Sequence, residues 1–144
     1  MKYTKILALM IITVIVAACV PAVSNEASME QFGEQITLSA GTYTNITPAE
    51  LDTLLQDKDF LLVNVHIPYE GDIPDTDLSI PYNDIESYKD LLPEDKDARL
   101  VIYCKSGPMA AIAAGELLEL GYTQLYNLEG GFVAWQAAGF PLEN

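Results

Sequence analysis

The feature of this sequence with the clearest chemistry is Cys104, together with the short loop that follows it. Cys104 comes directly after the apolar run 100–103 and opens the segment Cys104-Lys105-Ser106-Gly107-Pro108-Met109, beyond which an alanine- and leucine-rich stretch runs to Gly121. This pattern predicts a strand, a short loop and then a helix. The N–H groups of such a loop and of the first helical turn have no intrahelical partner, so they can bind an anion. A helix N-terminus also stabilises a thiolate, which is the nucleophilic form of cysteine.

Other residues near this loop have weaker signals. A packed core residue is the alternative role for Cys104, since free cysteine is among the most buried residue types, but the loop favours a nucleophile. Lys105 is the one cation of the loop and is a candidate electrostatic helper, with a solvated surface lysine as the alternative. The single histidine, His66, invites assignment as a general base, but we favour a structural role at the end of a strand.

The elements that must position the loop alternate between strands and helices. Thr47-Pro48-Ala49-Glu50 forms a capping box with proline at the first helical position, and Asn83 with Glu86 forms a second capping pair. The expected helices are 48–56, 83–92, 108–120 and 132–138, and the expected strands are 60–65, 100–104 and 124–128, with possible short strands at 36–38 and 78–80. This order predicts an α/β fold with a central, mostly parallel sheet and helices on both faces.

The N-terminus has the features of an export signal. Two lysines precede an uncharged apolar stretch at 6–18, which as a helix spans only about 20 Å, short of a hydrocarbon core of ~30 Å. Val16-Ala17-Ala18-Cys19 resembles a bacterial lipobox, whose cysteine is lipidated and becomes the mature N-terminus. We therefore expect a signal peptide at 1–18, a lipidated Cys19 with a flexible tether at 19–45, and a globular domain at 46–144. An uncleaved anchor helix is the alternative.

Charge and cysteine count limit the partners. The net charge is −14, and because two of the seven basic residues and no acidic residue precede position 25, the mature chain carries 5 minus 21, or −16. Such a charge excludes nucleic acid as a partner and slows the approach of small anions. With Cys19 lipidated, Cys104 is the one free thiol, so no intramolecular disulfide forms. We expect a monomer, exported and anchored by lipid, that faces the periplasm or the cell exterior.

Two motifs at the right separation resemble the rhodanese family. One is Cys104-Lys105-Ser106-Gly107 with the alanine-rich helix, and the other is Tyr126-Asn127-Leu128-Glu129-Gly130-Gly131-Phe132-Val133-Ala134-Trp135. The order of elements over 46–141 agrees as well. The resemblance implies a rhodanese-like fold and a sulfurtransferase in which Cys104 carries sulfane sulfur as a persulfide. Lys105, Ser106, Gly107, Pro108 and Met109 would form most of the cradle. The donor would be a small sulfane-sulfur compound or a protein persulfide, the acceptor a thiophile, and neither a metal nor an organic cofactor is needed.

The chain departs from the family pattern close to the loop. Met109 stands where the family often has a basic residue, and it is expected to favour an apolar or protein-bound donor, with simple packing as the alternative. Pro108 removes one N–H from the cradle. Asn64-Val65-His66 replaces the usual Asp-Val-Arg, and the following segment is shortened to Gly71-Asp72-Ile73-Pro74-Asp75. Substrate identity is therefore less well defined by the sequence than the fold.

Two other functions compete with sulfur transfer. A phosphatase of the Cdc25-like kind would need a longer loop closed by an arginine that binds phosphate, but the sixth residue after Cys104 is Ala110. The only arginine, Arg99, precedes the strand, so this function is disfavoured. A non-catalytic binding module tethered to the membrane is the stronger alternative, because the loop lacks the expected basic residue and the surface is acidic.

Overall fold

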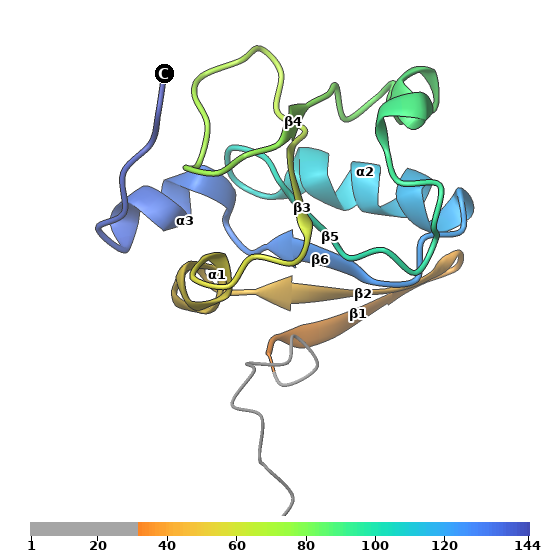
Figure 1. The fold of residues 1–144 in the computed structure, drawn as a ribbon, viewed down its shortest axis with the longest axis horizontal. Helices are drawn as coiled ribbons and strands as arrows, with labels where there is room; N and C mark the ends of the chain where they lie inside the picture. The colour runs from red at the N-terminus through yellow and green to blue at the C-terminus, as the bar shows by residue number, and fades with distance from the viewer. Residues whose placement is uncertain (1–31) are drawn as a thin grey trace, which may run out of the picture.

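The computed structural model describes residues 32–144, which fold around one six-stranded sheet (Figure 1). The elements in chain order are β1 (Glu34–Leu38), β2 (Gly41–Ile46), α1 (Pro48–Leu55), β3 (Leu61–Asn64), β4 (Leu78–Ser79), the 3-10 helix η2 (Ile85–Leu91), β5 (Leu100–Tyr103), α2 (Pro108–Glu119), β6 (Leu125–Leu128) and α3 (Gly131–Ala137). The predicted signal peptide, Cys19 and the first part of the predicted tether lie outside the described residues. Within residues 32–144, no helix has the length and apolar character needed to cross a membrane.

The sheet has the strand order β1-β2-β6-β5-β3-β4. Only the β1–β2 pair is antiparallel, and every other neighbouring pair is parallel. β5 lies between β3 and β6, so the strand that leads to Cys104 is hydrogen-bonded on both sides. The carboxyl ends of these parallel strands meet at one edge of the sheet, where ligands bind in open α/β sheets. The prediction of a mostly parallel central sheet is confirmed.

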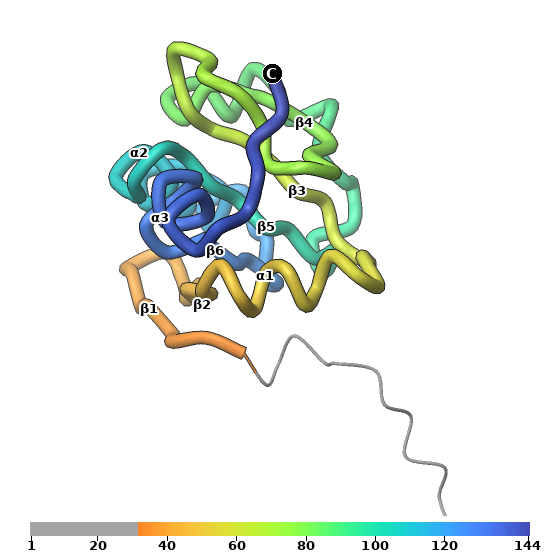
Figure 2. Tube along the Cα trace, turned by 90° about the vertical axis from the view of Figure 1, so that its left-hand side faces the viewer, coloured from red at the N-terminus to blue at the C-terminus, as the bar shows by residue number. Residues whose placement is uncertain are grey.

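Helices cover both faces of the sheet, as predicted. Because successive side chains of a strand point to opposite faces, Leu100 and Ile102 pack on one side of β5, and Val101 and Tyr103 on the other. The first side is covered by α2 and η2 and the second by α1 and α3. Figure 2 looks along the strands and shows α2 and α1 on opposite sides of the sheet.

The N-terminal boundary of the domain differs from the prediction. Residues 34–45 were expected to be tether, with one possible strand at 36–38, but they form most of the hairpin β1–β2. β2 pairs in parallel with β6, and its residues Tyr43 and Ile46 are buried in the two core layers. The tether prediction is therefore wrong for this hairpin. β1 is a mostly exposed edge strand, and its polar residues resemble those of a linker.

The helices show one correction and one confirmation. Residues 83–92 were expected to form an α-helix capped by Asn83, but η2 is a 3-10 helix that follows Asp84 and has no side-chain cap. Only Ile85 of η2 is buried, so little packing energy supports a longer helix here. The capping box of α1 is present, since the Glu50 N–H donates to the Thr47 hydroxyl and the Thr47 N–H donates to the Glu50 carboxylate at 2.7 Å.

Candidate active site

Strand β5 delivers Cys104 to the carboxyl edge of the sheet. Cys104 follows the last residue of the strand and continues its alternation, so the side chain packs on the same face as Leu100 and Ile102, under α2. The residue is only 1% exposed. The strand ends here because the chain turns into the loop that begins α2 at Pro108. Because Cys104 is almost fully buried, only a slender group can approach its sulfur atom.

The loop places a backbone donor on the sulfur atom of Cys104. The Gly107 N–H donates to the Cys104 Sγ at 3.0 Å. Gly107 has φ +117, a conformation that residues with a side chain rarely adopt, and it is the N-cap of α2. Pro108 is at the first helical position, where its missing N–H costs no intrahelical bond. A negative charge on the sulfur is therefore stabilised by an N–H group and by the N-terminal end of a twelve-residue helix.

The first turn of α3 holds the cysteine loop in place. The Phe132 N–H donates to the Cys104 carbonyl at 2.9 Å, and the Val133 N–H donates to the Lys105 carbonyl at 3.0 Å. This contact requires glycine at position 131, because a Cβ there would lie 2.1 Å from the Cys104 carbonyl oxygen. The paired glycines of the second sequence motif thus let α3 approach the backbone of Cys104.

The other predicted cradle residues have different surroundings. Lys105 is exposed and binds Glu70, with its Nζ 2.6 Å from the Glu70 Oε2. Ser106 and Pro108 are exposed, whereas Met109 is half-buried and packs against the core layer under α2. The structure thus brings Gly107 to the sulfur and turns the Lys105 ammonium toward a carboxylate from another loop.

That carboxylate belongs to the loop after β3. The Glu70 Oε1 also lies 3.4 Å from the His66 Nε2. A hydrogen bond from Lys105 is the largest cause that lowers the pKa of Glu70, and His66 adds to it. His66 is 9% exposed and contacts the Phe132 ring edge-on, with the ring centroids 5.4 Å apart. Within residues 32–144, neither ring nitrogen of His66 makes a hydrogen bond.

Buried polar groups give the loop after β3 its shape. The side-chain oxygen of Asn64 accepts from the His66 N–H at 2.9 Å, and its amide donates to the Asp72 Oδ1 at 2.9 Å. The Tyr103 hydroxyl donates to the same Asp72 oxygen at 3.1 Å and accepts from the Ile73 N–H at 3.0 Å. The segment Asn64-Val65-His66 thus anchors the loop that carries Glu70, next to the strand that carries Cys104.

Sequence reasoning did not identify Glu70, Asp72 or Tyr103 as residues around the site. Glu70 and Lys105 are 35 positions apart, and no spacing signal links them. The pairing of Glu70 with the cysteine loop can be recognised only when the structure shows the two loops next to each other. Asp72 was part of the shortened segment that the sequence singled out, but its role as a hydrogen-bond acceptor for Tyr103 and Asn64 depends on the fold.

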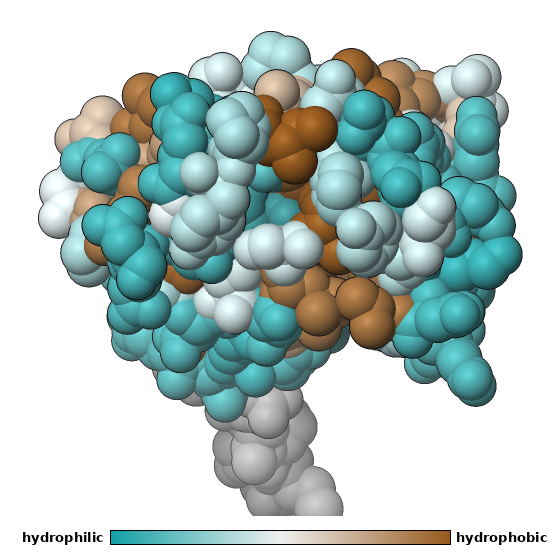
Figure 3. Space-filling model, turned by 90° about the horizontal axis from the view of Figure 1, so that it is seen from above, coloured by the Kyte–Doolittle hydropathy of each residue, from teal (hydrophilic) through white to brown (hydrophobic). Residues whose placement is uncertain are grey.

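The surface formed by the loop after β3 and its neighbours mixes apolar and polar residues. This loop is uppermost in Figure 1, and Figure 3 views the molecule from above. Hydrophobic residues gather near the middle of this face and hydrophilic residues occupy most of its margins (Figure 3). The exposed large apolar residues include Tyr69 in the loop after β3 and Val133 in α3, at 55% and 47% exposed.

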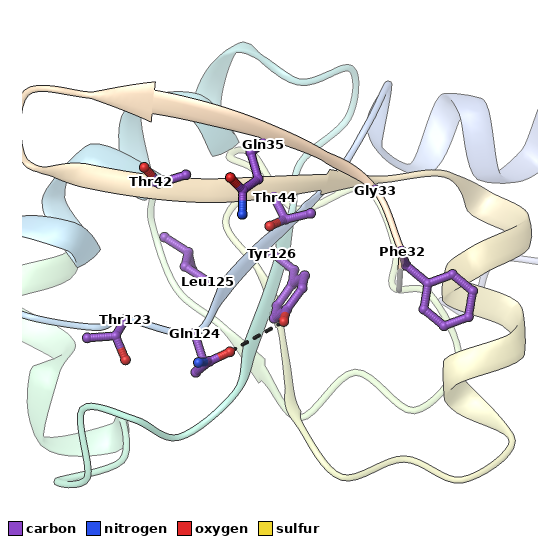
Figure 4. A pocket seen from close by; sticks show the side chains of 9 residues that line it. All are labelled: Phe32, Gly33, Gln35, Thr42, Thr44, Thr123, Gln124, Leu125 and Tyr126. Atoms are coloured by element: carbon purple, nitrogen blue, oxygen red, sulfur yellow. Dashed lines mark hydrogen bonds between the residues drawn. The ribbon is translucent and has the colours of Figure 1, made fainter. Parts of the chain in front are cut away.

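A pocket of about 580 Å³ lies at the opposite edge of the sheet from Cys104 (Figure 4). Leu125, the first residue of β6, lines it, whereas Cys104 follows the last residue of the parallel strand β5. Most of its other lining side chains are threonines and glutamines, and the Tyr126 hydroxyl donates to the Gln124 side chain at 3.4 Å. This pocket takes no part in the chemistry of the cysteine loop.

This geometry defines the class of protein: an α/β domain that holds a free, buried cysteine between the carboxyl end of a central parallel strand and a helix N-terminus. The sequence profile of the rhodanese-like domain matches residues 47–138, which is most of the described chain. The chain therefore belongs to the rhodanese-like domain family.

Named relatives of this chain include sulfurtransferases. A sulfurtransferase of Allochromatium vinosum is 38% identical over 92 residues, which cover 62% of this chain and 83% of that protein. The thiosulfate sulfurtransferase GlpE of Glaesserella parasuis is 28% identical over 105 residues, covering 71% of this chain and 94% of the relative. A rhodanese-like domain protein from Staphylococcus aureus has a crystal structure with a TM-score of 0.55 and 30% identity, covering 69% and 98% of the two chains. Several other curated relatives are longer, and this chain spans 26% to 59% of their length.

Proposed function

We propose that this protein is a sulfurtransferase that carries sulfane sulfur as a persulfide on Cys104. The Cys104 thiolate attacks the outer sulfur of the donor, so a new sulfur–sulfur bond forms at Cys104. The bond inside the donor breaks, and the leaving group departs with its electron pair. A nucleophilic acceptor then attacks the outer sulfur of the persulfide, and the Cys104 thiolate is released for another cycle.

The observation that carries this proposal is the hydrogen bond from the Gly107 N–H to the Cys104 Sγ at 3.0 Å. This N–H group is directed at the sulfur atom that carries the negative charge in the thiolate. After sulfur transfer, the same N–H group lies next to the persulfide. The named sulfurtransferases among the relatives support the same reaction class. Within the described chain, the one arginine, Arg99, precedes the first residue of β5 and is paired with Asp59, so a phosphate would find no bidentate partner in the loop at the other end of this strand.

The test is mass spectrometry of the protein after incubation with thiosulfate and, separately, with an organic persulfide. We expect the peptide that contains Cys104 to gain the mass of one sulfur atom, and we expect the gain to disappear after treatment with a thiol acceptor. The variant Cys104→Ser should show no gain. Alkylation by iodoacetamide serves as the control that Cys104 is reduced and reachable. An alkylated Cys104 that gains no sulfur from either donor would overturn the proposal.

A further inference from the structure

The cationic side chain of the cysteine loop, Lys105, is already paired with a carboxylate. The Lys105 Nζ lies 2.6 Å from the Glu70 Oε2, although both side chains are partly exposed, at 46% and 39%. Lys105 is adjacent to the nucleophile, and Met109 brings no charge to the other end of the loop. The two charges cancel, so an incoming anion meets the loop N–H groups without a net cationic side chain.

Glu70 is held in place by more than its contact with Lys105. Its second carboxylate oxygen faces the His66 Nε2 at 3.4 Å, and His66 itself is buried. The His66 N–H is bound to the Asn64 side chain, which fixes the start of the loop. The Glu70 carboxylate is ionised at neutral pH even at its ordinary pKa of 4.5, and the hydrogen bond from Lys105 lowers that pKa further. A carboxylate paired with the residue next to Cys104 acts on every charged ligand that approaches the loop.

We propose that Glu70 is a specificity-determining residue that directs this site toward sulfur donors of low charge, such as an organic persulfide, and away from the thiosulfate dianion. The proposal rests on the sulfur transfer proposed above. In the favoured step, the Cys104 thiolate attacks the outer sulfur of RS–SH and the RS–S bond breaks. The leaving thiolate takes the persulfide proton to become RSH, and Cys104 retains the sulfur as a persulfide anion. With thiosulfate, the leaving group would instead be sulfite.

Apolar surface beside the loop fits an organic donor better than an inorganic anion. Tyr69 precedes Glu70 and is exposed, with its hydroxyl bound to the Asp72 Oδ2 at 3.0 Å, so the ring is held in position. Val133 is also exposed, and its N–H donates to the Lys105 carbonyl. These two side chains offer exposed apolar surface to an organic group R. Thiosulfate has no apolar part to use them.

The first experiment uses two alkylating reagents of similar shape and different charge. The rates at which iodoacetate and iodoacetamide modify Cys104 are measured by peptide mass spectrometry, and their ratio reports the electrostatic bias of the site without requiring sulfur transfer. Glu70→Gln should raise the iodoacetate to iodoacetamide ratio by about tenfold at low salt, with a smaller rise at high salt. The matched control is Glu119→Gln, which removes the same charge from the exposed far end of α2 and should change the ratio less than about twofold.

The second experiment measures sulfur loading of Cys104 with thiosulfate and with the persulfide of a neutral thiol, 2-mercaptoethanol. We expect Glu70→Gln to raise the loading rate with thiosulfate about tenfold and with the persulfide less than about threefold. The double variant with Lys105→Gln should lose most of the gain with thiosulfate. If Glu70→Gln matches Glu119→Gln in both experiments, the role of Glu70 is overturned while the proposed function stands. If no variant gains sulfur from either donor, sulfur transfer is overturned and donor selection with it.

Discussion

The close contact between α3 and the cysteine loop predicts a large effect of a single methyl group. In Gly131→Ala, the new Cβ would lie 2.1 Å from the Cys104 carbonyl oxygen and 2.6 Å from the Lys105 carbonyl carbon, both of them backbone atoms. Real Cβ atoms essentially never approach closer than 3.0 Å, so α3 and the loop must separate by at least 0.9 Å, the difference between 3.0 and 2.1 Å. That separation stretches the hydrogen bond from the Phe132 N–H to the Cys104 carbonyl.

The expected cost has two parts. Gly131 has φ +60, and a residue with a Cβ in this left-handed conformation costs roughly 1–2 kcal/mol. Forcing apart a packed contact adds about 1–3 kcal/mol. The matched control is Gly139→Ala, because Gly139 has φ +93 and its Cβ would meet nothing within 4 Å, so only the first part applies. Gly131→Ala should therefore lose at least ~1 kcal/mol more than the control.

Urea unfolding followed by circular dichroism measures both free energies of unfolding. The slope of the transition should stay the same in the two variants, so the difference in midpoint reports stability. Gly131→Ala should also change the rate at which iodoacetamide alkylates Cys104, because the Cys104 carbonyl is displaced. Gly139→Ala should leave that rate unchanged. Equal free energies of unfolding for the two variants would show that α3 does not need a glycine to dock, and the reasoning from the close contact would be refuted.

Two further predictions concern the supports of the site and of the domain edge. Tyr103→Phe removes the hydroxyl that donates to Asp72 and leaves the Ile73 N–H without that acceptor. We therefore expect the free energy of unfolding, measured in urea, to fall by about 1–3 kcal/mol. A fall below ~0.5 kcal/mol would contradict this role of the hydroxyl. Burial alone would raise the pKa of Glu50, but hydrogen bonds from Thr47 and from the Gly33 N–H outweigh it and lower the pKa. The unfolded chain then binds the proton more tightly, so this contribution is present above the ordinary pKa of 4.5 and is lost as the pH falls through the lower folded value. Unfolding measured against pH should show a steeper acid loss in the wild type than in Glu50→Gln, and parallel curves would count against the assignment.

Local signals in the sequence were sufficient for the parts of the fold that bury a continuous apolar run. The strand that leads to Cys104 is apolar along its whole length, because β5 is covered on both faces, and the α1 capping box lies within four consecutive residues. These elements were predicted correctly. The hairpin β1–β2 was missed because β1 is an edge strand whose residues are mostly exposed, so its polar composition is typical of a linker as well as of such a strand.

Contacts between distant loops could not be predicted in the same way. The cysteine and the paired glycines could be related because both motifs are local and resemble a known pattern, and the structure joins them through Phe132 and the Cys104 carbonyl. Glu70 and Lys105 come from loops after two different strands, and their meeting depends on the order β5-β3 in the sheet. The expected α-helix at 83–92 failed for a related reason, since a cap signal cannot tell how much of the segment is buried.

The position of β5 in the middle of the sheet has a consequence for the mobility of the cysteine loop. Its backbone is paired with β3 on one side and β6 on the other, so its amides should be among the slowest in the protein to exchange with deuterium. We therefore expect the start of the cysteine loop to be rigid, and the sulfur atom of Cys104 to keep its position relative to the sheet. In the proposed sulfur transfer, the donor and the acceptor would therefore have to reach Cys104 at the same place, one after the other, and both would have to fit one narrow approach to its sulfur atom.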